Sequence, residues 1–176
     1  MEILSKLQKI DASLLGYIYK QSRRRTVVPV AKAISRSGDG YLHALIPLLL
    51  LLMAAPQANG FFVLLAGALL IERILYWLLK NGLKRRRPQD FFPDFSSIIT
   101  ASDRFSFPSG HTSGAFLLAT ALAVVYASPF IVVYAWACLV GLSRVVLGVH
   151  FPGDTLVGAL MGSGCCLLVA NFMELI

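Results

Sequence analysis

The sequence predicts an all-α fold, an integral membrane bundle of about five transmembrane helices preceded by amphipathic helices. The first observation behind this prediction is composition, since 57% of the 176 residues are hydrophobic and only 14% are charged. The mean hydropathy of +0.71 is too high for a soluble domain of this length. The second observation is that the apolar residues form runs close to the roughly 20 residues that a helix needs to cross a bilayer.

Residues 1–38 are predicted to form amphipathic helices at the membrane surface. Charged residues interrupt residues 1–21, so this segment lacks the unbroken apolar core of a signal peptide. Its apolar residues recur at helical spacing, as in a helix that lies in the interface; they are Leu4, Leu7, Ile10, Leu14, Leu15 and Ile18. For a second amphipathic segment, residues 27–34, packing on the end of the bundle and binding to the lipid surface are equally good interpretations.

Five apolar segments follow and are predicted to span the membrane. They are residues 41–55, which are few for a full crossing, 60–79, 111–127, 130–147 and 155–172. No internal repeat or low-complexity linker divides the chain, so residues 1–176 are expected to form one domain with its transmembrane bundle over 39–176. Small residues four apart, such as Gly158 and Gly162, indicate close helix packing within the bundle or at a dimer interface, and the oligomeric state is left open.

The net charge of +7 lies on one side of the predicted bundle. With five spans, the cations of residues 6–36 and 80–104 fall on one face, whereas the connections at 56–59 and 128–129 contain no Lys or Arg. The positive-inside rule places the basic face in the cytoplasm, although some of these cations could instead bind an anionic headgroup or substrate. Nucleic-acid binding is not expected, because the cations border spans and no aromatic-rich soluble domain accompanies them.

Three polar motifs stand where apolar segments end or begin. The first, Lys80 to Pro88, closes the second long span, where Gly82 can end the helix and Pro88 prevents a new helix from running through it. A basic run after a span is usually only a topology signal. Lys80 and Arg87 therefore become candidates for anion binding through the motifs that follow.

The second motif is Pro108-Ser109-Gly110-His111, directly before an apolar run. Ser109 is placed to cap the coming helix, and Gly110 leaves the backbone open to close approach. The free N–H groups and the positive dipole end of a helix start form a ready anion site. His111 would then lie beside a bound phosphate, although a Ser cap followed by His is by itself more often structural.

The third motif runs from Ser143-Arg144 to His150 and Asp154. An arginine near the end of a membrane span costs a few kcal/mol unless it is paired or reaches an aqueous cavity, so Arg144 is expected to face an anion. Asp154 precedes the last span and can cap its helix. It can also accept the imidazole N–H of His150, which would leave the other ring nitrogen with a free lone pair, and both roles are compatible.

Together these motifs resemble the type 2 phosphatidic acid phosphatases (PAP2), membrane relatives of the vanadium-dependent haloperoxidases. The family pattern is Lys-x6-Arg-Pro, Pro-Ser-Gly-His and Ser-Arg-x5-His-x3-Asp, and residues 80–88, 108–111 and 143–154 match it completely. Outside residues 80–154 the agreement is only in hydropathy. Many members carry an additional amino-terminal span, where this chain begins with amphipathic segments.

The resemblance implies hydrolysis of a lipid-linked phosphate or diphosphate through a phosphohistidine, with no metal or other cofactor. His150 would attack phosphorus, Asp154 would orient His150, and His111 would protonate the leaving oxygen and then activate water. The expected phosphate ligands are Lys80, Arg87, Ser109, Gly110 and Arg144. A metal-binding role for Asp90, Asp94 and Asp103 is not expected; they are interpreted as solvating their loop or balancing its cations.

Several properties of the substrate and the membrane topology stay open at this point. First candidates for the substrate are undecaprenyl diphosphate, phosphatidylglycerol phosphate, phosphatidic acid and a lipid A phosphate. A phosphotransferase would need the same residues, whereas an anion transporter is disfavoured because the opposite face lacks ionisable residues. The resemblance implies a multi-pass protein of the bacterial inner (cytoplasmic) membrane, but the cation distribution favours a cytoplasmic site and bacterial relatives commonly act on the outer face.

Three further features are predicted around these motifs. The loop between the predicted spans 60–79 and 111–127 contains Phe91, Phe92 and other aromatic residues. We interpret this loop either as an interfacial anchor or as a guide for a lipid tail. Glu72 and Arg73 are adjacent inside a span and must be compensated; Glu72 could connect to the polar site through a neighbour. The three cysteines, Cys138, Cys165 and Cys166, are interpreted as packing residues within spans.

Overall fold

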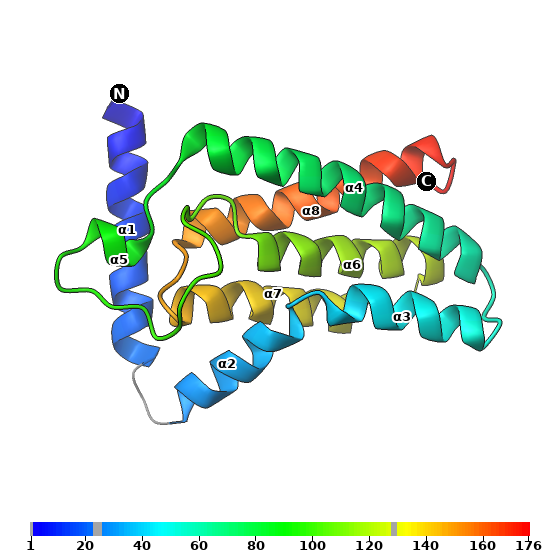
Figure 1. Ribbon diagram of the computed structural model, residues 1–176, viewed down its shortest axis with the longest axis horizontal. Helices are drawn as coiled ribbons and strands as arrows, with labels where there is room; N and C mark the ends of the chain where they lie inside the picture. The colour runs from blue at the N-terminus through cyan, green and yellow to red at the C-terminus, as the bar shows by residue number, and fades with distance from the viewer. Residues whose placement is uncertain (1, 23–25, 128–129) are drawn as a thin grey trace.

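The computed structural model describes residues 2–22, 26–127 and 130–176, and the regular elements in these ranges are all helices (Figure 1). In chain order they are α1 Glu2–Ser22, α2 Val27–Ser37, α3 Tyr41–Leu52, α4 Ala58–Leu83, α5 Pro88–Phe91, α6 Gly110–Tyr126, α7 Phe130–Val146 and α8 Pro152–Phe172. The all-α prediction is confirmed. The five predicted spans correspond to α3, α4, α6, α7 and α8, each within a few residues of its expected bounds.

The outer faces of these helices suit a bilayer. By length and composition α4 and α8 can cross a membrane, and α3, α6 and α7 are shorter apolar helices. Large hydrophobic side chains are exposed around the bundle, among them Leu48, Leu52, Phe62, Leu70, Leu139 and Leu160. Exposed apolar surface of this extent is unfavourable in water but is solvated by lipid tails.

The two amino-terminal helices pack on the bundle. The five long helices run side by side, and α1 lies across one of their ends (Figure 1). α1 buries Leu15 completely against Val145 and Phe151, while α2 packs Ala31 against Val146 of α7. For α2, the interpretation as a helix packed on the end of the bundle is therefore the one that the structure shows.

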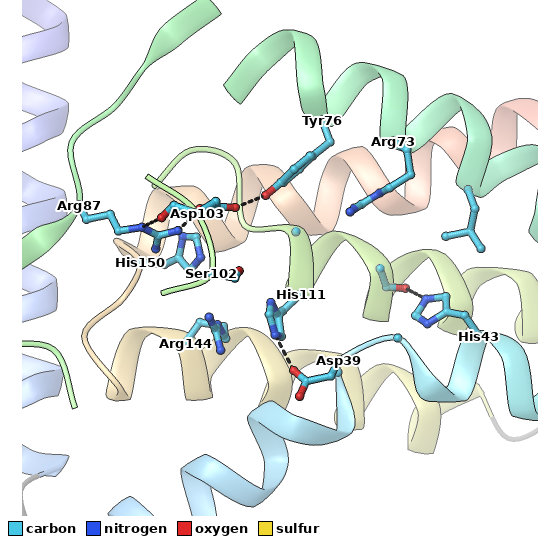
Figure 2. Close-up of a pocket in the computed structure, with 15 residues that line it drawn as sticks. Asp39, His43, Arg73, Tyr76, Arg87, Ser102, Asp103, His111, Arg144 and His150 are labelled. Atoms are coloured by element: carbon cyan, nitrogen blue, oxygen red, sulfur yellow. Dashed lines mark hydrogen bonds and ion pairs between the residues drawn. The ribbon is translucent and has the colours of Figure 1, made fainter. Parts of the chain in front are cut away.

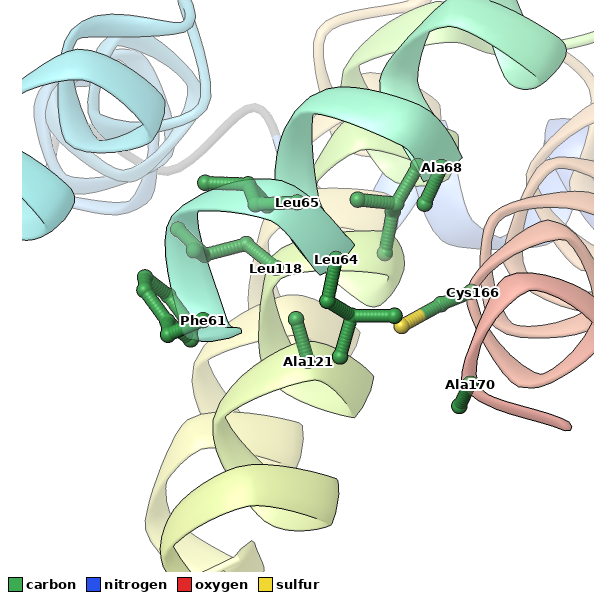
Figure 3. Close-up of a cluster of buried hydrophobic side chains, with 9 residues drawn as sticks. Phe61, Leu64, Leu65, Ala68, Leu118, Ala121, Cys166 and Ala170 are labelled. Carbon is green, nitrogen blue, oxygen red and sulfur yellow. The ribbon is translucent and has the colours of Figure 1, made fainter. Parts of the chain in front are cut away.

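α6 occupies the centre of the bundle and contacts α4, α7 and α8. The largest apolar cluster joins α4, α6 and α8 (Figure 3). Its buried members are Phe61, Leu64, Leu65, Ala68, Leu117, Leu118, Ala121, Cys166 and Ala170. Cys165 is buried too, as predicted, but Cys138 is exposed on α7, so its interpretation as a packing residue is wrong.

Glycines allow α8 to touch the backbone of α6. A Cβ atom on Gly162 would lie 2.0 Å from the carbonyl oxygen of Ser113, and one on Gly158 would lie 2.6 Å from that of Ser109. Since real Cβ atoms do not approach so closely, only glycine fits at these two positions. The small-residue spacing thus serves packing within the bundle, as one of its two interpretations proposed.

One end of the bundle gathers all three polar motifs. α4 and α7 end there, and α6 and α8 begin there, with the connection from α5 to α6 folded over them (Figure 1). Helices of alternating direction bring their termini to the same end of a bundle. This placement explains how motifs separated by tens of residues in the sequence come together.

Candidate active site

The predicted site residues converge on one cavity of about 470 Å³ (Figure 2). Those that line it directly are Arg87, Gly110, His111, Arg144 and His150. Of the other three, Lys80 and Asp154 contact the lining residues Asp103 and His150, and Ser109 directly precedes Gly110 in the chain. The three motifs therefore form a single site, as the sequence predicted.

His150 lies in the turn between α7 and α8, almost completely buried at 2% exposure. Its Nδ1 is 3.5 Å from Oδ2 of the fully buried Asp154, which is longer than an ordinary hydrogen bond. Asp154 Oδ2 also accepts a hydrogen bond from the backbone N–H of Phe151 at 2.9 Å, and Oδ1 accepts one from Arg85 Nη1 at 2.6 Å. Asp154 thus caps α8, as predicted, and faces the imidazole without a hydrogen bond to it; that it accepts the imidazole N–H stays a prediction.

The surroundings of His150 keep its imidazole neutral. Burial lowers the pKa of His150 to about 4, and the opposing effect of the Asp154 carboxylate does not outweigh it. A neutral ring whose Nδ1 faces a carboxylate has its Nε2 lone pair available to an electrophile. This is the protonation state that a nucleophilic histidine requires.

Two of the predicted phosphate ligands are held by one carboxylate, that of Asp103. Lys80 Nζ donates to Asp103 Oδ2 at 2.8 Å and to Tyr76 Oη at 2.7 Å. Arg87 donates to Asp103 Oδ1 and, at 2.5 Å, to the carbonyl oxygen of Val149. Of the two interpretations of this loop aspartate, balancing cations is the one that the contacts support.

Asp103 remains ionised under all ordinary conditions. Burial by itself would raise its pKa, but hydrogen bonds from Lys80 and Tyr76 and the positive charges of Lys80 and Arg87 outweigh burial and lower the pKa of Asp103 to about 2. The cations are therefore preorganised by an internal anion. A bound phosphate has to share them with this carboxylate.

Arg144 is the cation that points into the cavity without a carboxylate partner among the described residues (Figure 2). Its Nη1 donates to Ser35 Oγ at 2.5 Å, and its buried Nε has no hydrogen-bond partner there. A buried guanidinium with unused donors is costly unless an anion satisfies it. This agrees with the expectation that Arg144 faces an anion.

Ser109 occupies the N-cap position of α6, but its hydroxyl does not cap the helix. The Ser109 hydroxyl instead pairs with the Thr112 hydroxyl at 2.9 Å, so the predicted side-chain cap is wrong. Gly110 is needed for space, because a Cβ there would lie 2.9 Å from the ring of Tyr76. The backbone N–H groups at the start of α6 consequently remain uncapped by Ser109 beside the cavity, in the place expected for an anion.

His111 faces the cavity from the first turn of α6, and its Nε2 lies 2.7 Å from Asp39 Oδ1. Asp39 belongs to the turn between α2 and α3 and was not identified from the sequence. The site therefore contains two His–Asp pairs, with the cations of Arg87 and Arg144 also lining the cavity.

Comparison with known families agrees with this geometry. The model of the PAP2 superfamily matches residues 61–175, which include all three motifs and most of the chain. The chain belongs to the PAP2 superfamily. Relatives of this PAP2 protein include the lipid A 1-phosphatase of Rhizobium johnstonii, 36% identical over 134 residues, which are 69% of this chain and 53% of that protein. Phosphatidylglycerophosphatase B of Bacillus subtilis is 38% identical over 114 residues, or 58% and 53% of the two chains.

The PAP2 protein spans about half the length of these two relatives. Solved structures agree over more of the chain. Aquifex aeolicus LpxE superposes with a TM-score of 0.76 at 29% identity, over 90% of this chain and 93% of that one. The PAP2-type phosphatidylglycerolphosphate phosphatase of Bacillus subtilis has a TM-score of 0.76 at 25% identity, over 97% and 88% of the two chains.

Glu72 and Arg73 are connected to the PAP2 site through Arg73 itself. The fully buried Glu72 carboxylate accepts hydrogen bonds from Arg73 Nε at 2.5 Å and Nη2 at 2.6 Å, and from Ser113 Oγ at 2.6 Å. Arg73 lines the cavity and is half exposed to it (Figure 2). The pair is thus compensated inside the span, and Arg73 is the neighbour through which Glu72 reaches the site.

His43, at the start of α3, is a cavity residue that sequence reasoning missed. Its Nε2 lies 2.9 Å from the carbonyl oxygen of Gly114, and its buried Nδ1 has no hydrogen-bond partner in the described part of the chain. The available signal was a lone histidine at the start of an apolar segment. Arg85 was also missed, because it stood in a basic run with no local sign of which member would reach Asp154.

The aromatic residues between α4 and α6 pack against other rings of the protein. Phe95 packs on Tyr19 with ring centroids 4.4 Å apart, and Phe91 packs edge-on against Phe151 at 6.0 Å. No phenylalanine lies among the residues that line the main cavity. Both interpretations of the loop, as an interfacial anchor and as a guide for a lipid tail, stay predictions.

The described residues hold no group of three or more His, Cys, Asp or Glu side chains that could bind a metal ion. Asp90 and Asp94 are exposed and lie away from the cavity lining. The chemistry that the described side chains can supply is an uncharged histidine nucleophile, a second histidine for proton transfer, and fixed cations around the reacting phosphorus.

Proposed function

We propose that this PAP2 protein hydrolyses a lipid-linked phosphate or diphosphate through a phosphohistidine on His150, without a metal ion. The observation that carries the proposal is the shared cavity of His150, His111, Arg87 and Arg144. A neutral buried imidazole on one wall and a second imidazole paired with a carboxylate on another are the groups that a double displacement at phosphorus needs.

In the first step, His150 Nε2 forms a bond to phosphorus as the bond to the leaving oxygen breaks, and His111 gives that oxygen a proton. In the second step, His111 takes a proton from water as the water oxygen attacks phosphorus and the N–P bond breaks. Inorganic phosphate leaves, and both histidines return to their starting states. The cations of Arg144, Arg87 and Lys80 would stabilise the negative charge that develops on the nonbridging oxygens. Lys80 is held beside the cavity by its hydrogen bond to Asp103.

The shape of the site supports a lipid as the leaving group. On one side of His111 the cavity continues past Leu69 and Gly114, between the apolar helices α3, α4 and α6. On the other side a second cavity of about 420 Å³ is lined by Lys32 and Arg36 of α2. The lipid portion would lie on the apolar side, and water and released phosphate would pass on the basic side.

The names of the relatives support the same substrate class. Besides the lipid A and phosphatidylglycerol phosphate enzymes, a decaprenylphosphoryl-5-phosphoribose phosphatase of Mycobacterium tuberculosis is 28% identical over 144 residues, 80% of this chain and 77% of that protein. These names share a phosphate carried by a membrane lipid and differ in the lipid. We therefore propose the class of substrate, with undecaprenyl diphosphate, phosphatidylglycerol phosphate, phosphatidic acid and a lipid A phosphate as the compounds to test.

The decisive experiment is phosphate release from these purified lipids in the presence of EDTA. Wild type should release phosphate and His150→Ala should not, while Asp94→Asn, a change of an exposed carboxylate in the neighbouring loop, should behave as wild type. Inhibition by EDTA would contradict the metal-free mechanism. Product analysis with and without a lipid or sugar acceptor separates hydrolysis from phosphotransfer.

The proposed location is the bacterial inner membrane, and the face is a separate question. A single cysteine in the loop beside the site can report on which side of the membrane the site lies. Ser96 is exposed, whereas Ser97 is half-buried and hydrogen-bonded to Gln89, so Ser96→Cys in a Cys-free background is a better probe than a cysteine at Ser97. Labelling of that cysteine by an impermeant thiol reagent in intact cells indicates an outward-facing site. Labelling only after lysis indicates a cytoplasmic one.

A further inference from the structure

Asp39 is an acidic partner of His111 that lies outside the three motifs. Its Oδ1 is 2.7 Å from His111 Nε2, whereas the part of the chain that matches the family model begins at residue 61. Figure 2 shows the two side chains pointing toward each other, Asp39 from the α2–α3 turn and His111 from the start of α6. The contact parallels the approach of Asp154 to His150 on the other wall of the cavity.

The turn around Asp39 depends on two glycines. Gly40 has a φ of +97°, a conformation that residues with a side chain rarely adopt. A Cβ on Gly38 would lie 2.8 Å from Val140 Cγ1 of α7. Backbone hydrogen bonds from Gly38 N to Ser35 O at 3.0 Å and from Asp39 N to Arg36 O at 3.1 Å close the end of α2.

Side chains also tie this turn to α7. Trp136 Nε1 donates to Ser37 Oγ at 2.9 Å, and Arg144 Nη1 donates to Ser35 Oγ at 2.5 Å. Both serines belong to the last turn of α2, directly before Asp39. The carboxylate is therefore held in a fixed position relative to the helix that carries Arg144, as a positioning group must be.

Charges around His111 explain why it needs an anion. Arg144 faces the same ring and opposes a positive imidazole, whereas Asp39 and Asp103 favour it. The other polar or charged side chains around the cavity are His43 of α3, Arg73 and Tyr76 of α4, Arg87 and Ser102 of the connections, and His150. Since cations are numerous in this group, a carboxylate in direct contact offsets the positive charge that His111 acquires when it takes up a proton.

We propose that Asp39 is the positioning residue of the proton-transferring histidine: it accepts the Nε2–H of His111, fixes the ring, and leaves Nδ1 to exchange a proton with the substrate. The proposal rests on the proposed phosphatase function. In the first step the Nδ1 proton moves to the leaving oxygen as the P–O bond breaks; in the second, Nδ1 takes a proton from the attacking water. The Asp39 carboxylate keeps its contact with Nε2 throughout and compensates the charge of the imidazolium.

The test compares two amphiphilic phosphates with the same alkyl chain, one an alkyl phosphate and the other a nitrophenyl phosphate. An alkoxide leaving group needs the proton, whereas a nitrophenolate does not. For Asp39→Asn, kcat/KM for the alkyl phosphate should fall on the order of 100-fold, the typical contribution of general acid catalysis. For the nitrophenyl phosphate, kcat/KM should stay within about threefold, while kcat falls because activation of water still needs His111.

Matched variants separate positioning from structure. His111→Asn should show the same dependence on the leaving group, and the double variant should be no worse than His111→Asn alone. Asp39→Glu should recover part of the alkyl phosphatase activity, since it restores the carboxylate. Asp94→Asn should match wild type on both substrates, and thermal unfolding in detergent confirms that each variant is folded.

Each alternative outcome has a separate meaning. Equal losses of kcat/KM on the two substrates would overturn the positioning role and leave Asp39 a structural residue. A gain of activity in Asp39→Asn would overturn it as well, because the carboxylate would then act chiefly by repelling the phosphate. Failure of the wild type to release phosphate from either substrate would overturn the proposed function itself, and the role of Asp39 with it.

Discussion

Replacing Asp103 with Asn should strengthen the binding of phosphate-like anions. The Asp103 carboxylate accepts hydrogen bonds from Lys80 Nζ at 2.8 Å, from Tyr76 Oη at 2.6 Å and from Arg87. A phosphate that binds Lys80 and Arg87 must therefore lie beside a permanent negative charge. Asparagine has nearly the same size and keeps one acceptor oxygen, but it removes that charge.

The magnitude follows from Coulomb's law. Two anions that contact one ammonium group lie about 5 Å apart, and at an effective dielectric constant of about 20 two unit charges at this separation repel each other by about 3 kcal/mol. Salt screening and movement of the Asp103 side chain reduce this repulsion. We therefore expect a gain of at least about 1.4 kcal/mol, which is a tenfold decrease in the dissociation constant.

The assay is inhibition of the hydrolytic reaction by orthovanadate and by inorganic phosphate. Because the pKa of Asp103 is about 2, its carboxylate is ionised between about pH 5 and 9, so Asp103→Asn should have the lower inhibition constants throughout this range. Asp94→Asn, which changes an exposed carboxylate in the same connection, should leave inhibition unaltered. Weaker inhibition of Asp103→Asn would refute the reasoning, because it would mean that the carboxylate mainly holds Lys80 and Arg87 in place.

Three further predictions concern packing, protonation and charge. Gly162→Ala should destabilise the protein by about 1–3 kcal/mol, since its Cβ would lie 2.0 Å from a backbone oxygen of α6. Gly164→Ala is the control, because its Cβ would have no atom within 4 Å, and it should leave the melting temperature in detergent unchanged. Burial lowers the pKa of His150 to about 4, so on acidification this histidine takes up a proton in the unfolded chain before it does so in the folded protein. Wild type should therefore lose about 3 kcal/mol of stability between about pH 6.5 and 4, and His150→Gln should not. Arg85→Ala leaves the fully buried Asp154 carboxylate without its cation and should lower the free energy of unfolding by about 3 kcal/mol. Arg85→Lys should retain part of this stability. Equal melting temperatures for Arg85→Ala and wild type would contradict the prediction.

The spans and the meeting of the motifs could be predicted because both depend on local patterns. An apolar run long enough for a helix is visible in any window of the sequence, and each motif stood at the end or start of such a run. Once alternating helices are assumed, the end of α4, the start of α6 and the α7–α8 turn must fall on one side. His111, Arg144 and His150 followed from that geometry.

The partners of these residues could not be predicted, because they depend on tertiary packing. Asp39 is 72 positions from His111, and Arg85 is 69 positions from Asp154. Nothing in the local sequence distinguishes these charges from the solvated ones around them. Ser109 shows that short-range contacts can be missed as well, since its hydroxyl could pair with the helix backbone or with Thr112 and pairs with Thr112.

The contact of Gly158 and Gly162 with the backbone of α6 separates two tasks within the molecule. Main-chain atoms fix how far the start of α6 lies from the start of α8, and so how far His111 lies from His150. The wall formed by α3 and α4 meets the cavity through side chains such as Leu69 and Arg73. Evolution or a protein engineer can therefore change the shape of that wall while the two histidines keep their spacing.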